Sequence, residues 1–304
     1  MNKITISIGI PAYNEEKNIV NLLTLIRQQN SHQVELEKII VVSDGSTDKT
    51  AILLRKIKDK KLLTIENKKR IGKAGVLNKI FKLAQSKLLL ILDADVVIKD
   101  HNFLEKIVRE YLRENFDLLG IRVLELPPHN FLQRMLKLSM DMKREMYEDL
   151  NNGDNVYSCH GRARAFFKQY YKSLVIKQSM NEDAFSYLWC KKKNLIYRYT
   201  KKAAVYYQLP ATLSDHIKQS RRFFSSQSVE HKGLSLQFIN KQYQIPGKKF
   251  AAIMLQKMLT SPLLTFSYLV LVVTIRIYNG VWKFNLDKWQ TSVSTKKLTV
   301  NLTV

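Results

Sequence analysis

The sequence predicts an α/β fold, with a mainly parallel sheet flanked by helices, for three reasons. Apolar patterns typical of strands alternate with patterns typical of helices over residues 4–97. The run LLLILDADVV at 88–97 is apolar enough for a strand buried on both faces. Polar or acidic loops follow the strands, at 11–16, 44–48 and 93–95. Because parallel strands end on one edge of a sheet, these loops are expected to face one crevice.

The first part of the chain repeats one unit of strand, loop and helix. Isoleucines alternate along residues 4–10, and Pro11 ends that strand. Asn14 is expected to cap the helix whose apolar stripe runs through 19–26. The same reasoning predicts strands at 38–43, 62–65 and 88–97, and helices at 52–57 and 76–84.

The alternation of strand and helix patterns is less regular after residue 100. The helix expected at 131–150 is basic and amphipathic, so it either packs on the sheet or lies on a membrane, and packing is favoured. The remaining elements are a helix at 103–113, a strand at 118–124, a strand near 156–158, a helix including 181–192, and strands at 196–199 and 203–208. The order of the strands in this half does not follow from the pattern.

Composition indicates a globular protein with anionic partners. Of 304 residues, 45% are hydrophobic, and 50 Lys and Arg against 26 Asp and Glu give a net charge of +24. This charge favours a nucleotide, a phospholipid surface or a nucleic acid without choosing among them. Cys159 and Cys190 are the only cysteines, so no disulfide framework or zinc site is expected, and a reducing compartment is the default.

A domain boundary is expected near Gln242, dividing a catalytic part, 1–242, from a membrane-associated segment, 243–304. Within the second part, residues 258–275 contain no charge and just reach the length of a membrane span. An in-plane amphipathic helix or a core helix are the alternatives. No signal peptide is expected at the start, because the apolar run is short and is followed by Pro11.

Asp93 and Asp95 are the first candidates for chemistry. In an extended chain, residues i and i+2 share a face, so both carboxylates would point the same way. Two hard oxygen ligands suit Mg²⁺ or Mn²⁺ with bound phosphates. The alternative is that one Asp caps the next helix while the other is solvated in a turn.

Six motifs together resemble the family 2 glycosyltransferases. They are PAYNEE, VVSDGSTDKT, GKAGVLN, LDAD, NED and QSRRF, in this order and over roughly residues 4–224. The features GKAGVLN, NED and QxxR look most like the branch of cellulose, chitin, hyaluronan and poly-N-acetylglucosamine synthases. The resemblance implies a GT-A fold, inverting transfer, a nucleotide-sugar donor and a divalent metal.

The resemblance also implies roles for single residues. Asp95 would hold Mg²⁺ or Mn²⁺, and Asp93 would share the metal or contact the nucleotide. Asp44 would accept hydrogen bonds from the uracil or ribose, and Lys73, at a helix start, would meet the diphosphate. Four residues of the first loop would line the nucleoside pocket: Pro11, Ala12, Tyr13 and Glu15.

On the acceptor side, Glu182 and Asp183 match the acidic pair of the family, with Asp183 as the general base. An inverting transfer needs a carboxylate opposite the leaving group to take the proton of the acceptor hydroxyl. Gln219 and Arg222 stand at the positions of QxxRW, with Phe223 in place of the Trp, and Arg222 would pair with the diphosphate. His160 is expected to be structural.

The predicted function is therefore transfer of a sugar, from a UDP-sugar, to a lipid-linked or polysaccharide acceptor at the cytoplasmic face of the membrane. The related synthases contain several transmembrane helices, whereas this chain has one candidate span and a mean hydropathy of -0.21. Extrusion of a polymer through a channel of its own is therefore not expected. The alternatives are a sugar-phosphate nucleotidylyltransferase and a basic non-enzymatic scaffold that binds membrane or nucleic acid. Nucleic acid is not expected as a partner, because no aromatic platform interleaves with the basic residues.

Overall fold

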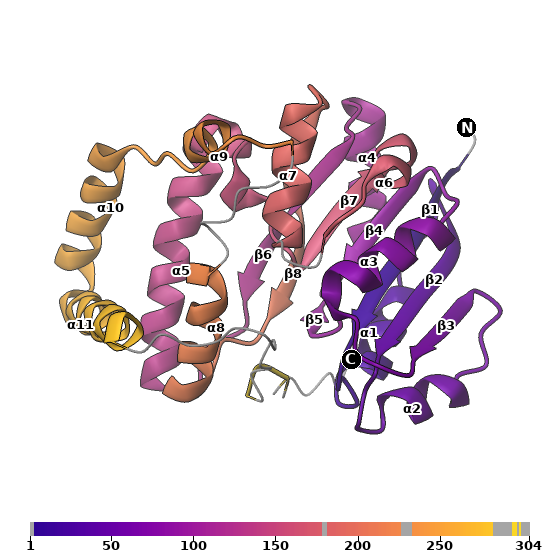
Figure 1. Ribbon diagram of the computed structural model, residues 1–304, viewed down its shortest axis with the longest axis horizontal. Helices are drawn as coiled ribbons and strands as arrows, with labels where there is room; N and C mark the ends of the chain where they lie inside the picture. The colour runs from indigo at the N-terminus through magenta and orange to yellow at the C-terminus, as the bar shows by residue number, and fades with distance from the viewer. Residues whose placement is uncertain (1–2, 178–180, 226–232, 282–293, 297, 299–304) are drawn as a thin grey trace.

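The computed structural model describes residues 3–177, 181–225, 233–281, 294–296 and 298, with the side chains of 221–225 and 278–281 left out. Strands and helices alternate through the first hundred residues, as expected (Figure 1). The elements of this part are β1 (Ile4–Ala12), α1 (Ile19–Arg27), β2 (Val34–Asp44), α2 (Thr50–Lys56), β3 (Leu62–Asn67), α3 (Gly72–Leu83), β4 (Leu88–Leu92) and β5 (Val96–Val97).

Helices dominate the rest of the chain. The elements are α4 (Phe103–Arg113), β6 (Leu118–Glu125), α5 (Phe131–Asp149), η1 (Leu150–Gly153), η2 (Val156–Ser158), β7 (Ala163–Phe167), α6 (Lys168–Ser173), α7 (Glu182–Lys192), β8 (Tyr197–Tyr207), α8 (Leu213–Ser225), α9 (Leu236–Gln242), α10 (Gly247–Thr260), α11 (Pro262–Val281) and η3 (Ser294–Lys296).

The eight strands form one sheet in the order β3-β2-β1-β4-β7-β6-β8-β5. The first four strands in this order run parallel, which confirms the expected βαβ units. β7 is antiparallel to both of its neighbours, β4 and β6, while β6 and β8 are parallel. The α/β class is therefore confirmed, and the sheet is mixed beyond β4.

The prediction of one continuous strand at 88–97 is wrong, because these residues form two strands. β4 ends at Leu92, Asp93 to Asp95 leave the strand, and β5 begins at Val96. β5 pairs with β8, at the far end of the strand order, rather than with a neighbour of β4. Three residues therefore connect two distant positions of the sheet, and the sheet must curl to bring them together.

Both faces of the sheet are covered by helices. Along β2, Ile39 and Val41 pack into the hydrophobic cluster that includes residues of α1 and α4, while Ile40 and Val42 pack into the cluster of α3, α6 and α7. All five residues of β4 are buried. A strand covered on both faces buries every side chain, which is why its sequence is a continuous apolar run.

Two strand predictions in the second half need correction. Residues 156–158 form the short helix η2, and the strand lies further on, in β7. The two strands expected at 196–199 and 203–208 are one strand, β8. Its register against β6 shifts where Lys201 and Lys202 are exposed, and these charged residues interrupted the apolar pattern.

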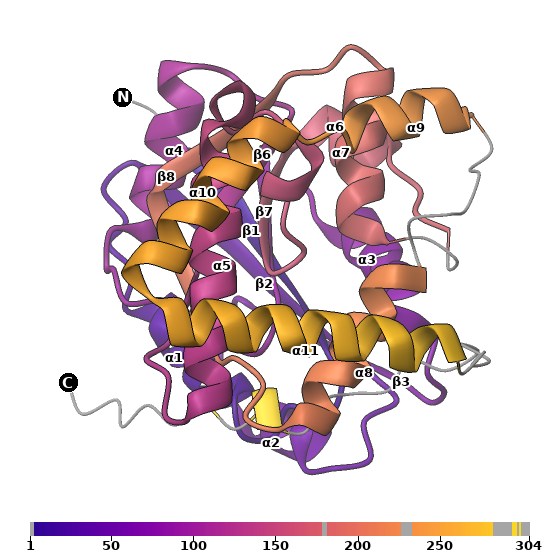
Figure 2. The same cartoon turned by 90° about the vertical axis from the view of Figure 1, so that its left-hand side faces the viewer.

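The helix α5 packs within the fold, as favoured. Leu136 contacts Tyr207 and Leu209 near the end of β8, and Met142 and Met146 pack with Ile253 of α10. Figure 2 shows α11 lying across α5 on the same side of the molecule as α10.

The span expected at 258–275 is not one helix. α10 ends at Thr260, Ser261 leaves helical geometry, and α11 starts at Pro262, which cannot continue a preceding helix. Within the described residues, no helix combines the length and apolarity that crossing a membrane requires. Cys159 and Cys190 are buried free thiols, in line with the expected lack of a disulfide.

Candidate active site

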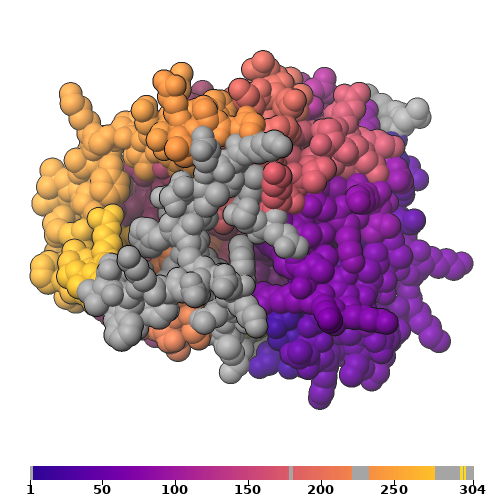
Figure 3. All heavy atoms as spheres, in the orientation of Figure 1, coloured from indigo at the N-terminus to yellow at the C-terminus, as the bar shows by residue number. Residues whose placement is uncertain are grey.

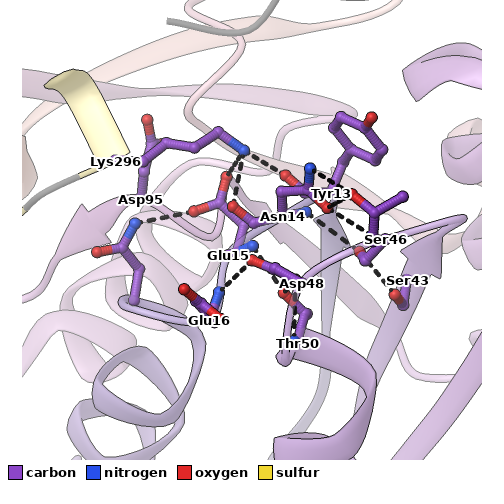
Figure 4. A network of polar contacts seen from close by, with 12 residues as sticks. Tyr13, Asn14, Glu15, Glu16, Ser43, Ser46, Asp48, Thr50, Asp95 and Lys296 are labelled. Atoms are coloured by element: carbon purple, nitrogen blue, oxygen red, sulfur yellow. Dashed lines mark hydrogen bonds and ion pairs between the residues drawn. The ribbon is translucent and has the colours of Figure 1, made fainter. Parts of the chain in front are cut away.

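The first two acidic loops, after β1 and β2, bind one another. Asn14 accepts a hydrogen bond from the Thr47 amide at 2.8 Å, and the Glu15 amide donates to Thr50 Oγ1 at 2.7 Å (Figure 4). Asn14 lies in the left-handed region, at φ 54°, and α1 begins only at Ile19, so the predicted N-cap role of Asn14 is wrong. Its side chain instead joins two loops that are separated by more than thirty residues.

Asp44, at the end of β2, is buried and fully engaged by protein groups. Its carboxylate accepts hydrogen bonds from Asn67 Nδ2 and from the amides of Ile71 and Gly72, each at 2.8 Å. These two amides lie at the start of α3, where backbone donors lack partners within the helix. Asp44 therefore fixes the position of Lys73 on α3. Its predicted role toward a nucleoside stays a prediction.

Lys73 joins the third acidic loop to the acidic pair on α7. Its ammonium lies 2.7 Å from Asp93 Oδ1 and 2.8 Å from Glu182 Oε1, and it donates to the Gly161 carbonyl at 3.4 Å. Burial opposes the charge, but the two carboxylates outweigh it and raise the pKa of Lys73 well above its usual value. Lys73 is therefore a fixed cation between two carboxylates that were predicted from separate motifs.

Asp93 and Asp95 both lie in the short connection after β4, and their carboxylates have different partners. Asp93 pairs with Lys73, whereas Asp95 accepts from Arg162 Nη1 at 3.3 Å to each carboxylate oxygen. Burial alone would raise the pKa of Asp93, but Lys73 and Arg162 hold it below the usual value. Asp95 is thus paired with Arg162, and Asp93 with Lys73.

Asp183 lies in the first turn of α7, where the helix dipole favours a carboxylate. It accepts hydrogen bonds from the amides of Gly161, at 3.1 Å, and Ala184, at 2.8 Å. Burial and the neighbouring Glu182 raise its pKa. A Cβ atom at Gly161 would come within 3.1 Å of both carboxylates, so a larger residue would require these side chains to shift. A buried carboxyl with a raised pKa is suited to proton transfer.

Two arginines at the start of the strand that crosses the site were not predicted from the sequence. Arg162 precedes β7 and lies over the ring of Tyr207 at 4.0 Å, while contacting Asp95. Arg164 is fully buried and donates to the Glu182 carbonyl and to Ser186 Oγ, both at 2.9 Å. Arginines at alternate positions of an apolar strand were the signal that could have found them, since a buried guanidinium needs a partner.

His160, expected to be structural, accepts a hydrogen bond from the Arg162 amide at 3.3 Å. Burial, together with Arg162, lowers its pKa to about 3, so the imidazole is neutral at ordinary pH. Gln219 lies on α8 and forms no hydrogen bond or ion pair with any described side chain. The side chain of Arg222 lies outside the described part of the structure.

The structure thus brings four predicted residues together: Lys73, Glu182 and Asp183 lie around Gly161, and Asp93 pairs with Lys73. Asp44 joins them through the start of α3, and Asp95 joins them through Arg162. Pro11 and Ala12 lie at the end of β1, on the strand edge where these loops emerge. The geometry supplies partly buried carboxylates, fixed cations and a carboxyl group of raised pKa at one edge of the sheet.

Two solved structures share this fold. The mannosyltransferase PcManGT of Pyrobaculum calidifontis, in complex with GDP-Man and Mn²⁺, matches with a TM-score of 0.58, 16% identity and coverage of 91% of this chain and 82% of that chain. TarS of S. aureus (residues 1–349), in complex with UDP, matches with a TM-score of 0.54, 18% identity and coverage of 85% and 73%. The chain therefore has the GT-A fold.

Sequence comparison identifies the family. The model for "Glycosyl transferase family 2" matches residues 7–175, more than half of the chain. The chain belongs to glycosyl transferase family 2, and it is a glycosyltransferase. This finding sets aside the nucleotidylyltransferase and scaffold alternatives.

Two curated relatives match over shorter stretches. The 4,4'-diaponeurosporenoate glycosyltransferase of Staphylococcus haemolyticus (strain JCSC1435) is 34% identical over 140 residues, which are 44% of this chain and 36% of that protein. The poly-beta-1,6-N-acetyl-D-glucosamine synthase of Staphylococcus aureus (strain COL) is 31% identical over 108 residues, 35% of this chain and 24% of that protein. The match to a synthase of this kind confirms the predicted resemblance, and it spans about a third or less of the relatives' length.

Proposed function

We propose that this glycosyltransferase moves a sugar, with inversion, from a nucleoside-diphosphate donor to a lipid-linked or polysaccharide acceptor at the cytoplasmic face of a membrane. The observation that carries the proposal is the cluster in which Lys73 pairs with Asp93 and Glu182 beside Gly161, whose amide donates to Asp183. A UDP-sugar is the donor we propose. Support comes from the resemblance of the motifs to polysaccharide synthases and from the UDP complex of the neighbour TarS.

Asp183 is the proposed general base. It takes the proton from the acceptor hydroxyl while that oxygen forms a bond to the anomeric carbon. The bond from this carbon to the diphosphate breaks, and its electron pair leaves with the diphosphate. Burial and Glu182 raise the pKa of Asp183, which strengthens it as a base. Arg164, which donates to the Glu182 carbonyl and to Ser186 Oγ on α7, is a positioning residue.

The residues fit a divalent cation that is bound together with its ligand. In the described part of the chain, no three His, Cys, Asp or Glu side chains converge as a metal cage. Mg²⁺ and Mn²⁺ do not require one, because one or two carboxylates and substrate phosphates suffice. Asp95 would hold the cation, with Asp93 nearby, and the bound metal would stabilise negative charge on the departing diphosphate. PcManGT was solved with Mn²⁺, which supports this choice.

The membrane part of the proposal rests on an apolar face of α11. Leu263, Phe266, Val270, Val273 and Ile277 recur at spacings of three and four residues and are between 49% and 68% exposed. Such spacing places them on one side of the helix. On α10, Leu255 and Leu259 are also exposed. We propose an anionic lipid surface as the occupant, because the chain has a net charge of +24.

A binding measurement tests the donor site. Titration calorimetry of the full chain with UDP and Mn²⁺ is expected to show metal-dependent binding, because diphosphate and Asp95 would share the cation. Asp95→Ala should weaken that binding by at least about tenfold, roughly 1.4 kcal/mol. Asp59→Asn is the matched control, since Asp59 pairs with Arg27 away from the site. Binding of UDP that is equal with EDTA, or unchanged in Asp95→Ala, would contradict the metal assignment.

A further inference from the structure

A residue far along the chain supplies a cation to the loop that follows β1. Lys296, at the end of η3, places Nζ 2.7 Å from Glu15 Oε1 and 3.0 Å from the Asn14 carbonyl oxygen, and it also donates to the Tyr13 carbonyl (Figure 4). An ammonium group has three N–H donors, so these three contacts satisfy it. The cation therefore acts on the loop itself.

The loop has a physical need for this cation. The Glu15 side chain is 9% exposed, and among the described residues its other side-chain hydrogen bond comes from Asn18 Nδ2 at 2.8 Å. Asp95 is close enough to repel the Glu15 carboxylate. Two backbone carbonyls, of Tyr13 and Asn14, point toward the same place, and Asn14 is held in the left-handed region. Without a cation, the negative charge of Glu15 and the partial negative charges of the two carbonyl oxygens would lie together in a poorly solvated position.

The segment that brings Lys296 is seated on the fold. Thr295 is buried, and Leu298 packs against the hydrophobic cluster that contains β1 and α1 residues. The Lys296 ammonium lies 5.6 Å from the centre of the Tyr13 ring, and the Arg70 guanidinium lies 4.0 Å from it. Tyr13 is therefore flanked by two cations, Arg70 from the loop before α3 and Lys296 from η3.

We propose that Lys296 is a positioning residue of the donor site, which holds Tyr13, Asn14 and Glu15 in the shape that receives the nucleoside diphosphate. The inference rests on the proposed function, because that function makes this loop the wall of the nucleoside pocket. It adds a residue from outside the matched family region, 7–175, to the donor site. Donor affinity would then depend on a segment that follows α11.

The test compares donor binding in variants of the full chain. Lys296→Met is expected to weaken UDP–Mn²⁺ binding about tenfold in calorimetry, because charge-assisted hydrogen bonds that shape the loop are lost. Lys296→Arg should recover most of the affinity, since guanidinium can donate to the same oxygens. Lys58→Met is the matched control, because Lys58 is exposed and lies away from the loop. If Lys296→Met does not fold, Lys296→Gln is measured in its place.

Steady-state kinetics distinguish a positioning role of Lys296 from a general loss of folded enzyme. With a sugar donor and an acceptor, Lys296→Met should raise the donor KM about tenfold while kcat and the acceptor KM stay within about twofold. A double-mutant cycle with Glu15→Gln should be non-additive, because the two side chains are in contact. Equal or tighter UDP binding in Lys296→Met would overturn the inference while leaving the proposed function intact. If the wild-type chain fails to bind UDP or GDP with metal, the proposed function itself fails.

Discussion

A single ammonium, that of Lys73, neutralises two carboxylates from different parts of the chain. Asp93 comes from the turn after β4, and Glu182 comes from the start of α7. Their contact with Lys73 fixes the distance between the side of the site with Asp95 and the side with Asp183. A buried ion pair of this kind is costly to break, because the remaining charge has no partner. Lys73 is therefore as important for the shape of the site as for its charge.

At this scale, the role of Asp183 gives a kinetic prediction. Asp183→Asn should lower kcat by about 10²- to 10⁴-fold, the usual contribution of general base catalysis, while UDP–Mn²⁺ binding stays unchanged. In the wild type, activity should fall as pH decreases through the raised pKa of Asp183, because the protonated carboxyl accepts no proton. The measurement is a pH profile of kcat/KM. Asp59→Asn serves again as control, and transfer at the normal rate by Asp183→Asn would exclude it as the base.

Sequence patterns located the acidic residues of the site better than its cations. Asp93 and Asp183 stand in motifs whose order along the chain is informative, and each lies where its strand end or helix start was expected. Lys296 could not be assigned, because a lysine in a chain of charge +24 has no distinctive local pattern, whereas the signal for Arg164 was its charge within an apolar strand. Their partners are set by tertiary contacts with Glu182 and Glu15.

Among the elements, the short connection between β4 and β5 has the largest effect on the site. A run of apolar residues on either side of Asp-Ala-Asp looked like one strand, since periodicity cannot reveal which strand pairs with which. The pairing of β5 with β8 turns the chain at Asp93, and the two carboxylates have different partners. The strand β7, which delivers Arg162 and Arg164, was placed too early because η2 also has a short apolar pattern.

The helix α11 carries the prediction for membrane binding. Phe266→Glu combined with Val273→Glu should reduce cosedimentation with phosphatidylglycerol vesicles by about tenfold or more. Each of the two apolar side chains would contribute roughly 1.5–3 kcal/mol to binding when it is buried in the lipid. Leu112→Glu is the matched control, since Leu112 is an exposed apolar residue on α4. Unchanged sedimentation would contradict the lipid surface as occupant. Concentration-dependent dimers without vesicles, lost in the same variant, would assign the face to a second copy instead.

At the scale of the whole molecule, the fold class and the edge of the sheet that forms the site were predictable. Parallel βαβ units have one handedness and one functional edge, so the strand–helix alternation was sufficient. The antiparallel β7 and the arrangement of α8 to α11 were not predictable, because antiparallel insertion and helix packing depend on side-chain fit rather than on periodicity. The predicted boundary near Gln242 stays a prediction, although it coincides with the end of α9.

The net charge gives a prediction for the whole chain. The excess of 24 positive charges should destabilise the folded state, because these charges repel one another, and salt screens that repulsion. Raising NaCl from about 10 mM to 150 mM shortens the screening length from roughly 30 Å to 8 Å. The midpoint of thermal unfolding, followed by circular dichroism, should therefore increase by a few degrees. A midpoint that falls with salt would mean that surface ion pairs outweigh the repulsion.

The two buried thiols have a practical consequence for following this enzyme at work. Burial raises the pKa of Cys159 to about 12 and also raises that of Cys190, so neither sulfur is a good nucleophile near neutral pH. A cysteine introduced on the surface would consequently react with a maleimide dye ahead of the native ones. A fluorophore placed that way beside the loop after β1 could report its motion in real time without replacement of either native cysteine.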